Sequence, residues 1–181
     1  PIYGIWNARA QEGAVDGWYQ TKFTLKEEPL VSILIPNKDH TDDLDVCLNS
    51  FFERADYQNY EFIIIENNSV LPETFAYYEK IEKEHDNVKV VYWEAGFNYS
   101  AINNFGFKFA KGDYIMLLNN DVELITPDIF QSMLGFCMRP EVGIVGAKLL
   151  YNDHTVQHAG VLVGAGGLAD HVFKGIHEDD P

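Results

Sequence analysis

Positive charge is scarce in this 181-residue sequence. Lysine and arginine number 13 against 28 aspartate and glutamate residues, so the formal net charge at pH 7 is −15. The summed field of such a chain repels polyanions, and we therefore expect no nucleic-acid partner and no binding to an anionic membrane surface. If the ligand carries phosphate groups, the compensating positive charge has to be supplied locally. A bound metal cation fits that requirement better than a basic patch.

Cysteine and long hydrophobic runs are scarce as well. Cys47 and Cys137 lie far apart and match no metal-ligand spacing, which indicates two core thiols in a reducing compartment. No positively charged start precedes an apolar segment, and no apolar run is long enough to cross a bilayer. We expect no transmembrane segment, and a location in the cytoplasm or peripherally at the inner face of the membrane. The hydrophobic content of 46% is sufficient for a core and argues against disorder.

What the sequence does contain is an alternation of short apolar runs with amphipathic stretches. This pattern is typical of βαβ units on a parallel sheet, and nearly continuous apolar runs are typical of strands covered on both faces. The expected strands are 31–35, 62–65, 88–93, 114–118 and 142–145. The expected helices are 41–52, capped at Thr41 with an acidic first turn, 72–85, 100–110, and one that starts at Thr126.

The two ends of the chain differ from this alternating pattern. Residues 1–29 show no sustained period and are expected to be a lead-in or linker, whereas residues 30–181 form one α/β domain. After Leu150 the sequence becomes Gly-rich, which favours a β-hairpin over another βα unit.

Polar residues follow three of the expected strands. In an open α/β sheet, ligands bind outside the carboxyl ends of the strands. Each polar segment taken alone is typical of an ordinary turn, but their coincidence at one edge of a sheet favours a ligand site. The three segments are Pro36-Asn37-Lys38-Asp39, Glu66-Asn67-Asn68-Ser69 and Asn119-Asn120-Asp121-Val122-Glu123.

Several of these segments resemble those of family 2 glycosyltransferases of the GT-A fold. The matching segments, in order, are 31–36, 61–69, 97–106 and 110–114, the last of which leads into the strand that ends in the family's D-x-D motif. The resemblance runs from about residue 31 to residue 175. Val156-Gln157-His158-Ala159-Gly160 is similar to a bacterial subgroup associated with cell-surface polysaccharide and rhamnose-containing glycans. The resemblance implies a GT-A-like αβα sandwich with a mostly parallel sheet.

The resemblance also implies roles for individual residues. Pro36 and Asn37 would line the nucleotide pocket, and Glu66, with Asn68 beside it, would accept a hydrogen bond from the base. Asn104 would support the loop under the diphosphate. The expected donor-binding residues are Pro36, Asn37, Glu66, Asn68, Asn98, Asn104, Asn119, Asn120 and His158.

Asn119-Asn120-Asp121 stands at the D-x-D position, with Asn where the family usually has its first Asp. We expect Mn²⁺ or Mg²⁺ there, with Asp121 as the direct ligand and the amide oxygen of Asn119 beside it. Hard cations prefer oxygen ligands, and the loss of one negative charge should weaken the affinity. Glu123 either supports the metal ligands from behind or is a solvated side chain.

The implied reaction is an inverting transfer of a sugar from a UDP-, dTDP- or GDP-linked donor to a glycan or lipid-linked acceptor, in polysaccharide biosynthesis of the cell envelope. An inverting transfer needs a carboxylate base, which in this family comes from a later acidic motif. Residues 178–180 are more typical of a solvated acidic tail. We therefore expect the base beyond the C-terminus, a domain incomplete at that end, and a fragment inactive by itself. The alternative is a non-catalytic nucleotide-sugar or glycan-binding module.

Three other interpretations of the same features are weaker. Residues 164–169 fit the dinucleotide pattern G-x-G-x-x-A, but a short, Gly-broken stretch follows instead of a helix. A nucleotidyltransferase would show a Gly-rich basic loop after the first strand, and residues 36–40 contain no glycine. The four histidines of the last quarter match no zinc spacing and fit donor-pocket or structural roles better; they are His154, His158, His171 and His177.

Overall fold

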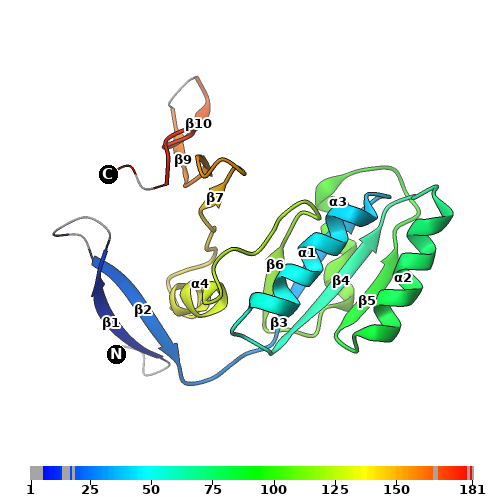
Figure 1. Cartoon of the computed structure of the whole chain (residues 1–181), viewed down its shortest axis with the longest axis horizontal. Coiled ribbons are helices and arrows are strands. Elements are labelled where there is room, and N and C mark those ends of the chain that lie inside the picture. Colours follow the sequence, from blue (N-terminus) through cyan, green and yellow to red (C-terminus); the bar gives the residue numbers. More distant parts are fainter. Residues whose placement is uncertain (1–5, 14–16, 18, 165–166, 179, 181) are drawn as a thin grey trace. The chain divides into compact units, whose positions relative to one another are not determined.

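The chain divides into two compact units. A computed structural model describes residues 6–13, 17, 19–164, 167–178 and 180. One unit is Glu28–Phe130, and the other combines Pro1–Glu27 with Gln131–Pro181 (Figure 1). Residues 165 and 166 of the Gly-rich segment and residue 179 of the acidic tail lie outside the described residues.

A parallel sheet of four strands forms the middle of the Glu28–Phe130 unit. Every neighbouring pair is parallel, and the strand order is β5-β4-β3-β6. The strands are β3 (Val31–Asn37), β4 (Tyr60–Glu66), β5 (Val88–Tyr92) and β6 (Tyr114–Leu117). The first four apolar runs predicted as strands are therefore confirmed, as is the parallel sheet.

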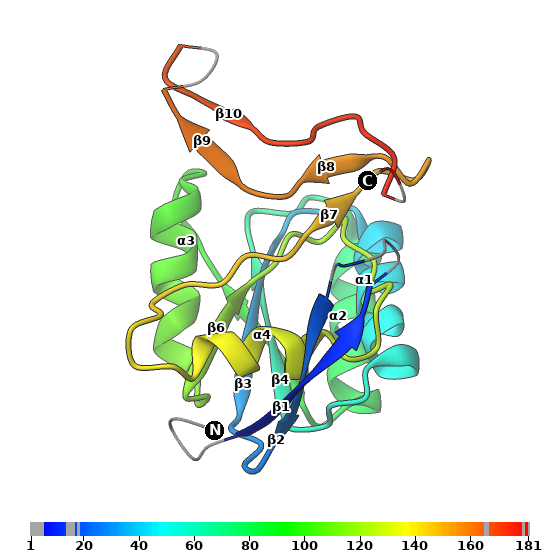
Figure 2. The same ribbon diagram turned by 90° about the vertical axis from the view of Figure 1, so that its left-hand side faces the viewer.

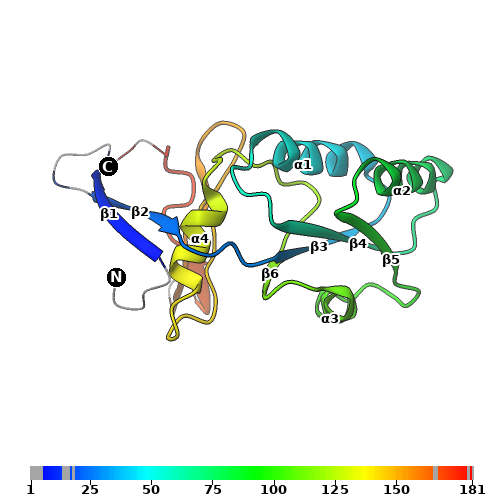
Figure 3. The same ribbon diagram turned by 90° about the horizontal axis from the view of Figure 1, so that it is seen from below.

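Helices cover both faces of this sheet. Helices α1 (Thr41–Arg54) and α2 (Pro72–Glu84) lie on one face, and α3 (Tyr99–Gly106) lies on the other (Figure 3). A 3₁₀ turn, η1 (Phe107–Phe109), extends α3 toward β6. The predicted three-layer αβα arrangement is confirmed. Each strand is apolar along most of its length because both faces of the sheet are covered.

Helix α3 packs closely against β4 at Gly106. Leu34, Ile65 and Ile102 of β3, β4 and α3 belong to one buried cluster. A Cβ atom on Gly106 would overlap the side chain of Ile65, which is fully buried. Glycine at this position therefore sets how closely α3 approaches β4.

The start of α1 differs from the prediction by one residue. The helix begins at Thr41, but its N-cap is His40, which has a φ of 46° and provides no side-chain cap. The predicted acidic first turn is present as Asp42 and Asp43. The predicted cap at Thr41 is therefore wrong, since the left-handed backbone of His40 turns the chain into the helix one residue earlier.

The other unit contains a hairpin at its N-terminal end. Strands β1 (Trp6–Glu12) and β2 (Tyr19–Leu25) pair antiparallel from Trp6 opposite Leu25 to Glu12 opposite Tyr19. Part of the stretch expected to be a lead-in is thus regular structure. Within residues 20–25, only Phe23-Thr24-Leu25 alternates between apolar and polar side chains, and this run is too short to predict a strand.

The remainder of this unit comprises a helix and short antiparallel strands. Its elements are α4 (Ile129–Cys137), β7 (Leu149–Leu150), β8 (Val156–His158), β9 (Val161–Val163) and β10 (Ala169–His171). β7 pairs with β8 and β9 with β10, so the predicted hairpin after Leu150 is confirmed (Figure 2).

Two predictions for this region need correction. Helix α4 begins at Ile129, after a turn at the predicted start. The predicted strand 142–145 is wrong, because these residues form no regular structure. Glycines 143 and 146 interrupt the run, and Ile144 is 90% exposed. No helix within the described part of the chain is long and apolar enough to cross a bilayer.

Candidate functional site

The carboxyl ends of β3 and β6 mark the point where the strand order reverses. From β3 the chain passes through α1 to β4 and then β5 on one side, whereas β6 lies on the other side of β3. Pairing between β3 and β6 ends where Leu118 N donates to Leu34 O at 3.0 Å, while β3 stays paired with β4 as far as Asn37 opposite Glu66. Pro36 therefore lies where β3 has lost one neighbour, at the position where ligands bind in open α/β sheets.

Asn37 joins the exits of the central strands. Its Oδ1 accepts a hydrogen bond of 2.7 Å from Asn120 Nδ2, across the separation of β3 and β6. Its Nδ2 donates to the Asp39 carbonyl and to Tyr78 Oη, both at 2.7 Å. Asn37 is only 3% exposed, so its amide is fixed within the protein and orients Asn120.

Glu66, at the exit of β4, is held by a second set of hydrogen bonds. The amide and hydroxyl of Ser69 donate to its two carboxylate oxygens at 2.6 and 2.5 Å, and Tyr78 Oη lies 3.4 Å from Oε2. Glu66 is 4% exposed. Burial is the main cause that raises the pKa of Tyr78 to about 12, so its phenol keeps its proton for this contact. Glu66 thus anchors the loop after β4.

Asp39 ties the loop after β3 to the start of α2. Its Oδ1 accepts hydrogen bonds of 3.1 Å from the amides of Val70 and Leu71 and from Thr74 Oγ1. The backbone of Asp39 is left-handed, with a φ of 52°. Leu71 is the N-cap of α2, and its side chain caps no N–H group. The Asp39 carboxylate therefore accepts from N–H groups at the start of α2 that the helix itself leaves free.

Helix α1 holds the segment that follows β6. Ser50 Oγ accepts from Leu124 N at 2.9 Å, and Arg54 Nη1 donates to the Leu124 carbonyl at 2.8 Å. Arg54 Nη2 also forms an ion pair of 2.7 Å with Glu123. Glu123 is therefore a salt-bridge partner of α1 rather than a freely solvated side chain.

Asp121 is exposed and forms no hydrogen bond or ion pair with any other residue for which the structure gives a position. Asn119 is also exposed, and its carbonyl accepts a long contact of 3.9 Å from Cys47 Sγ. Within the described ranges no group of three His, Cys, Asp or Glu side chains could hold a metal. A single free carboxylate fits a hard cation that takes its remaining ligands from water and phosphate. It does not fit a cation held by protein groups alone.

The asparagines of α3 differ in environment. Asn98 is the N-cap, and its Oδ1 accepts from Ala101 N at 3.0 Å. Asn104 is exposed, whereas Asn103 is only 6% exposed. Asn103 Nδ2 donates to the Tyr99 carbonyl at 2.9 Å, but its buried Oδ1 has no partner among the described residues.

Asn68 and His158 complete the predicted set. Asn68 is exposed, with a φ of 58°, and its Nδ2 donates to the Ala95 carbonyl at 2.8 Å, which links the exits of β4 and β5. His158 ends β8 and belongs to the other unit. Its place beside the sheet residues stays a prediction.

Three residues of this network and the buried Asn103 of α3 were missed in the sequence. Tyr78, Ser50 and Arg54 lie on helices, where spacing alone indicates only a packed or a solvated face. Asn103 stands beside Asn104, and one sequence does not indicate which of the two is buried. Ser50, Arg54 and Tyr78 lie on the helices that follow β3 and β4, and their contacts can be recognised only once the fold is known.

The sequence is similar to known proteins over most of its length. The profile of Glycosyl transferase family 2 matches residues 32–161. The O-antigen biosynthesis protein RfbC of Myxococcus xanthus is 41% identical over 155 residues, which are 86% of this chain and 12% of that protein. The uncharacterized protein y4gI of Sinorhizobium fredii (strain NBRC 101917 / NGR234) is 40% identical over 168 residues, 91% of this chain and 18% of that protein. The chain thus spans less than a fifth of either relative.

Solved structures show the same fold at low sequence identity. The mannosyltransferase PcManGT from Pyrobaculum calidifontis, in complex with GDP-Man and Mn²⁺, matches with a TM-score of 0.59 and 16% identity, covering 65% of this chain and 35% of that one. Residues 1–349 of S. aureus TarS match with a TM-score of 0.52 and 18% identity, covering 71% and 41%. The resemblance to GT-A glycosyltransferase structures confirms the predicted fold class.

Proposed function

Because the chain belongs to glycosyl transferase family 2, we propose that it binds a nucleoside diphosphate sugar at the carboxyl edge of its parallel sheet and takes part in the transfer of that sugar. The observation that carries this proposal is the hydrogen bond between Asn120 and Asn37, which brings the exits of β6 and β3 together where the strand order reverses. The third exit, at Glu66, connects to the same Asn37 through Tyr78.

The nucleoside is proposed to lie over the exits of β3 and β4. Pro36 lies beyond the residues of β3 that pair with β6, and Asn68 is exposed just after the end of β4. Glu66 accepts hydrogen bonds from Ser69 and Tyr78 on both carboxylate oxygens, so a base contact there would use a remaining lone pair. Asn37 acts chiefly by orienting Asn120.

The diphosphate is proposed to lie at the exit of β6, beside Asp121 and Asn119. The exposed Asp121 carboxylate would hold Mn²⁺ or Mg²⁺ there, with the Asn119 amide oxygen as a neutral neighbour. When bound, such a cation neutralises charge that develops on the leaving nucleoside diphosphate. Since one carboxylate is a weak site, cation and nucleotide should bind together and neither tightly alone.

The transfer is proposed to invert the anomeric centre and to serve polysaccharide biosynthesis, with a glycan or a lipid-linked molecule as acceptor. The O-antigen biosynthesis relative supports a glycan product, and PcManGT and TarS 1–349 have been solved with GDP-Man and UDP-GlcNAc respectively. The donor of this chain is accordingly proposed to be a UDP-, GDP- or dTDP-linked sugar.

Titration calorimetry with UDP, GDP and dTDP, each with and without Mn²⁺, tests this proposal. We expect one nucleotide to bind in the presence of Mn²⁺, and at least tenfold more weakly without the metal or in Asp121→Ala, because a cation–phosphate contact is lost (about 1.4 kcal/mol per tenfold change). Asp113→Ala is the matched control, since that exposed carboxylate lies just before β6, at the opposite end of the strand. Equal binding by Asp121→Ala and the unmodified protein would exclude Asp121 as the ligand.

A further inference from the structure

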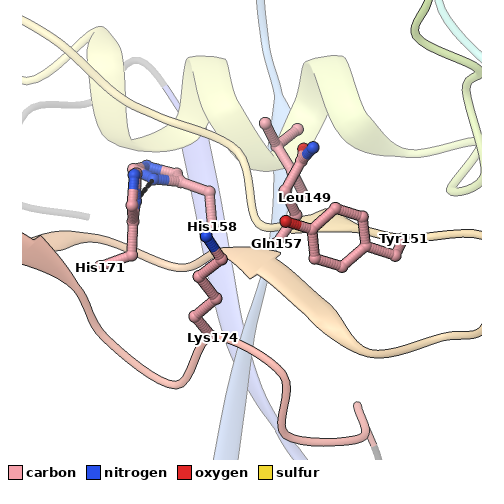
Figure 4. Close-up of a pocket in the computed structure, with 6 residues that line it drawn as sticks. All are labelled: Leu149, Tyr151, Gln157, His158, His171 and Lys174. Atoms are coloured by element: carbon pink, nitrogen blue, oxygen red, sulfur yellow. Dashed lines mark hydrogen bonds between the residues drawn. The ribbon is translucent and has the colours of Figure 1, made fainter.

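A hollow lies among the short strands of the Pro1–Glu27 and Gln131–Pro181 unit (Figure 4). Its volume is about 420 Å³, and a neighbouring hollow of about 370 Å³ shares His158 with it. The larger hollow is lined by Leu149, Tyr151, Gln157, His158, His171 and Lys174. Lys148 lines the smaller one. His158 therefore stands between two hollows, each of which has one lysine.

The lining of these hollows is unusual for so acidic a chain. The formal net charge is −15, yet no carboxylate is among the described residues that line either hollow. Lys174 forms no ion pair with a described carboxylate. Asp170, beside His171 in β10, accepts a hydrogen bond of 2.8 Å from the His171 amide. The described linings of the two hollows thus contain lysine and N–H donors but no carboxylate.

The two histidines of the larger hollow contact each other directly. His158 Nδ1 and His171 Nδ1 are 2.9 Å apart. A dashed line in Figure 4 marks this contact. One Nδ1 must carry the proton and the other must accept it. In the neutral pair the accepting ring then has an Nε2–H donor, and one further proton gives the other ring an Nε2–H donor as well. The pair can therefore present one or two donors, the second together with a positive charge.

We propose that this hollow binds the phosphate or diphosphate group of a ligand, with Lys174 as the charged contact and the Nε2 atoms of His158 and His171 as donors. Lysine binds phosphate as a point charge, and Gln157 and Tyr151 add neutral donors in the same lining. Several donors from different elements suit a tetrahedral phosphate better than a planar carboxylate. The proposal goes beyond the donor site at Asp121 because it needs neither that residue nor a metal.

Two sources share this chemistry, namely the diphosphate of a nucleotide and the phosphate of a lipid-linked acceptor. Inorganic pyrophosphate in a buffer with EDTA is the first probe, since chelation removes any cation from Asp121. We expect the unmodified protein to bind pyrophosphate, and Lys174→Met and His158→Gln each to bind it roughly tenfold more weakly, through loss of a charged hydrogen bond. The exposed Lys26→Met, in the same unit, is the control and should bind as the unmodified protein does.

Histidine ring signals in NMR spectra provide a second readout. Pyrophosphate should shift the ring protons of His158 and His171 and leave those of the exposed His40 unchanged. UDP and geranyl diphosphate, each without metal, then distinguish the nucleotide source from the lipid source by competition with pyrophosphate. No metal-free binding, or full binding by Lys174→Met, would overturn the inference. Loss of metal-free binding in Asp121→Ala would overturn it too, but would leave the donor site at the sheet edge in place.

Discussion

Asn120 Nδ2 donates a hydrogen bond of 2.7 Å to Asn37 Oδ1, and this contact joins β6 to β3 beyond the last hydrogen bond between the two strands. The same Asn37 donates to Tyr78, which contacts Glu66. Three strand exits are thus connected through one buried amide. At this edge β3 and β6 are no longer paired, so polar side-chain contacts hold their ends in place.

Replacing Asn37 with alanine should lower the free energy of unfolding by about 1–3 kcal/mol, because Asn120 and the buried Tyr78 each lose a partner. Urea denaturation measures the change. Asn49→Ala is the control and should cost less than about 1 kcal/mol, since the Asn49 amide donates to Asp45 on its own helix. An Asn37 variant as stable as this control would show that the network adds nothing to the fold.

Much of the sheet could be predicted because its strands are covered on both faces. A short, nearly continuous apolar run such as 62–65 is typical of such a strand. The run 142–145 looked similar but is not a strand, since an apolar run becomes a strand only with a partner to pair with. The hairpin at 6–25 was missed because its sequence pattern is weak. Its two strands form because they pair with each other, and that pairing is not visible in either segment alone.

The polar strand exits were predictable from composition and order, whereas their connections were not. That Asn37 lines a pocket stays a prediction, and the hydrogen bond between its amide and Asn120 could not be predicted from the sequence. Contacts between residues far apart in sequence, such as Arg54 with Leu124, depend on how α1 lies across the sheet. A single sequence carries no direct signal for them.

Replacing Arg54 with alanine should loosen the segment after β6 and weaken Mn²⁺-dependent nucleotide binding roughly three- to tenfold, because the loop must be ordered again on binding. The free energy of unfolding should change by less than about 1 kcal/mol, as both side chains of the Arg54–Glu123 pair are partly exposed. Calorimetry and urea denaturation measure the two effects.

Two further variants distinguish positioning from a general charge effect. Lys83→Ala removes an exposed ion pair with Glu79 on α2 and should leave nucleotide binding unchanged. Arg54→Lys should restore binding only in part, because one ammonium cannot reproduce both guanidinium contacts. Full binding by Arg54→Ala would exclude the positioning role.

Replacing Gly106 with alanine should destabilise the Glu28–Phe130 unit by about 1–3 kcal/mol, because the new methyl group overlaps the buried Ile65. Gly96→Ala is the matched control, since its Cβ would meet nothing within 4 Å and its φ is not positive. Thermal and urea unfolding of the two variants measure the difference. Equal stability of both would mean that α3 can move away from β4 without loss.

Tyr78 should make stability depend on alkaline pH. Burial raises its pKa from 10.0 to about 12, so the folded state holds a proton that the unfolded state has lost between these values. Its contribution is complete below pH 10 and is lost as pH rises through 12. In Tyr78→Phe this part of the loss, about 1.4 kcal/mol between pH 8 and pH 11, should disappear in urea denaturation. An identical pH dependence in both proteins would contradict the shift.

Paramagnetic broadening by Mn²⁺ in the presence of the preferred nucleotide tests the donor site most directly. We predict that the amide signals of Asn37, Asn67 and Asp121 disappear, while those of Val31 and Gly112, at the opposite edge of the same sheet, remain. In Asp121→Ala the other four signals should all remain. Broadening at Val31 and Gly112, with Asn37 and Asn67 unaffected, would contradict a donor site at the carboxyl edge.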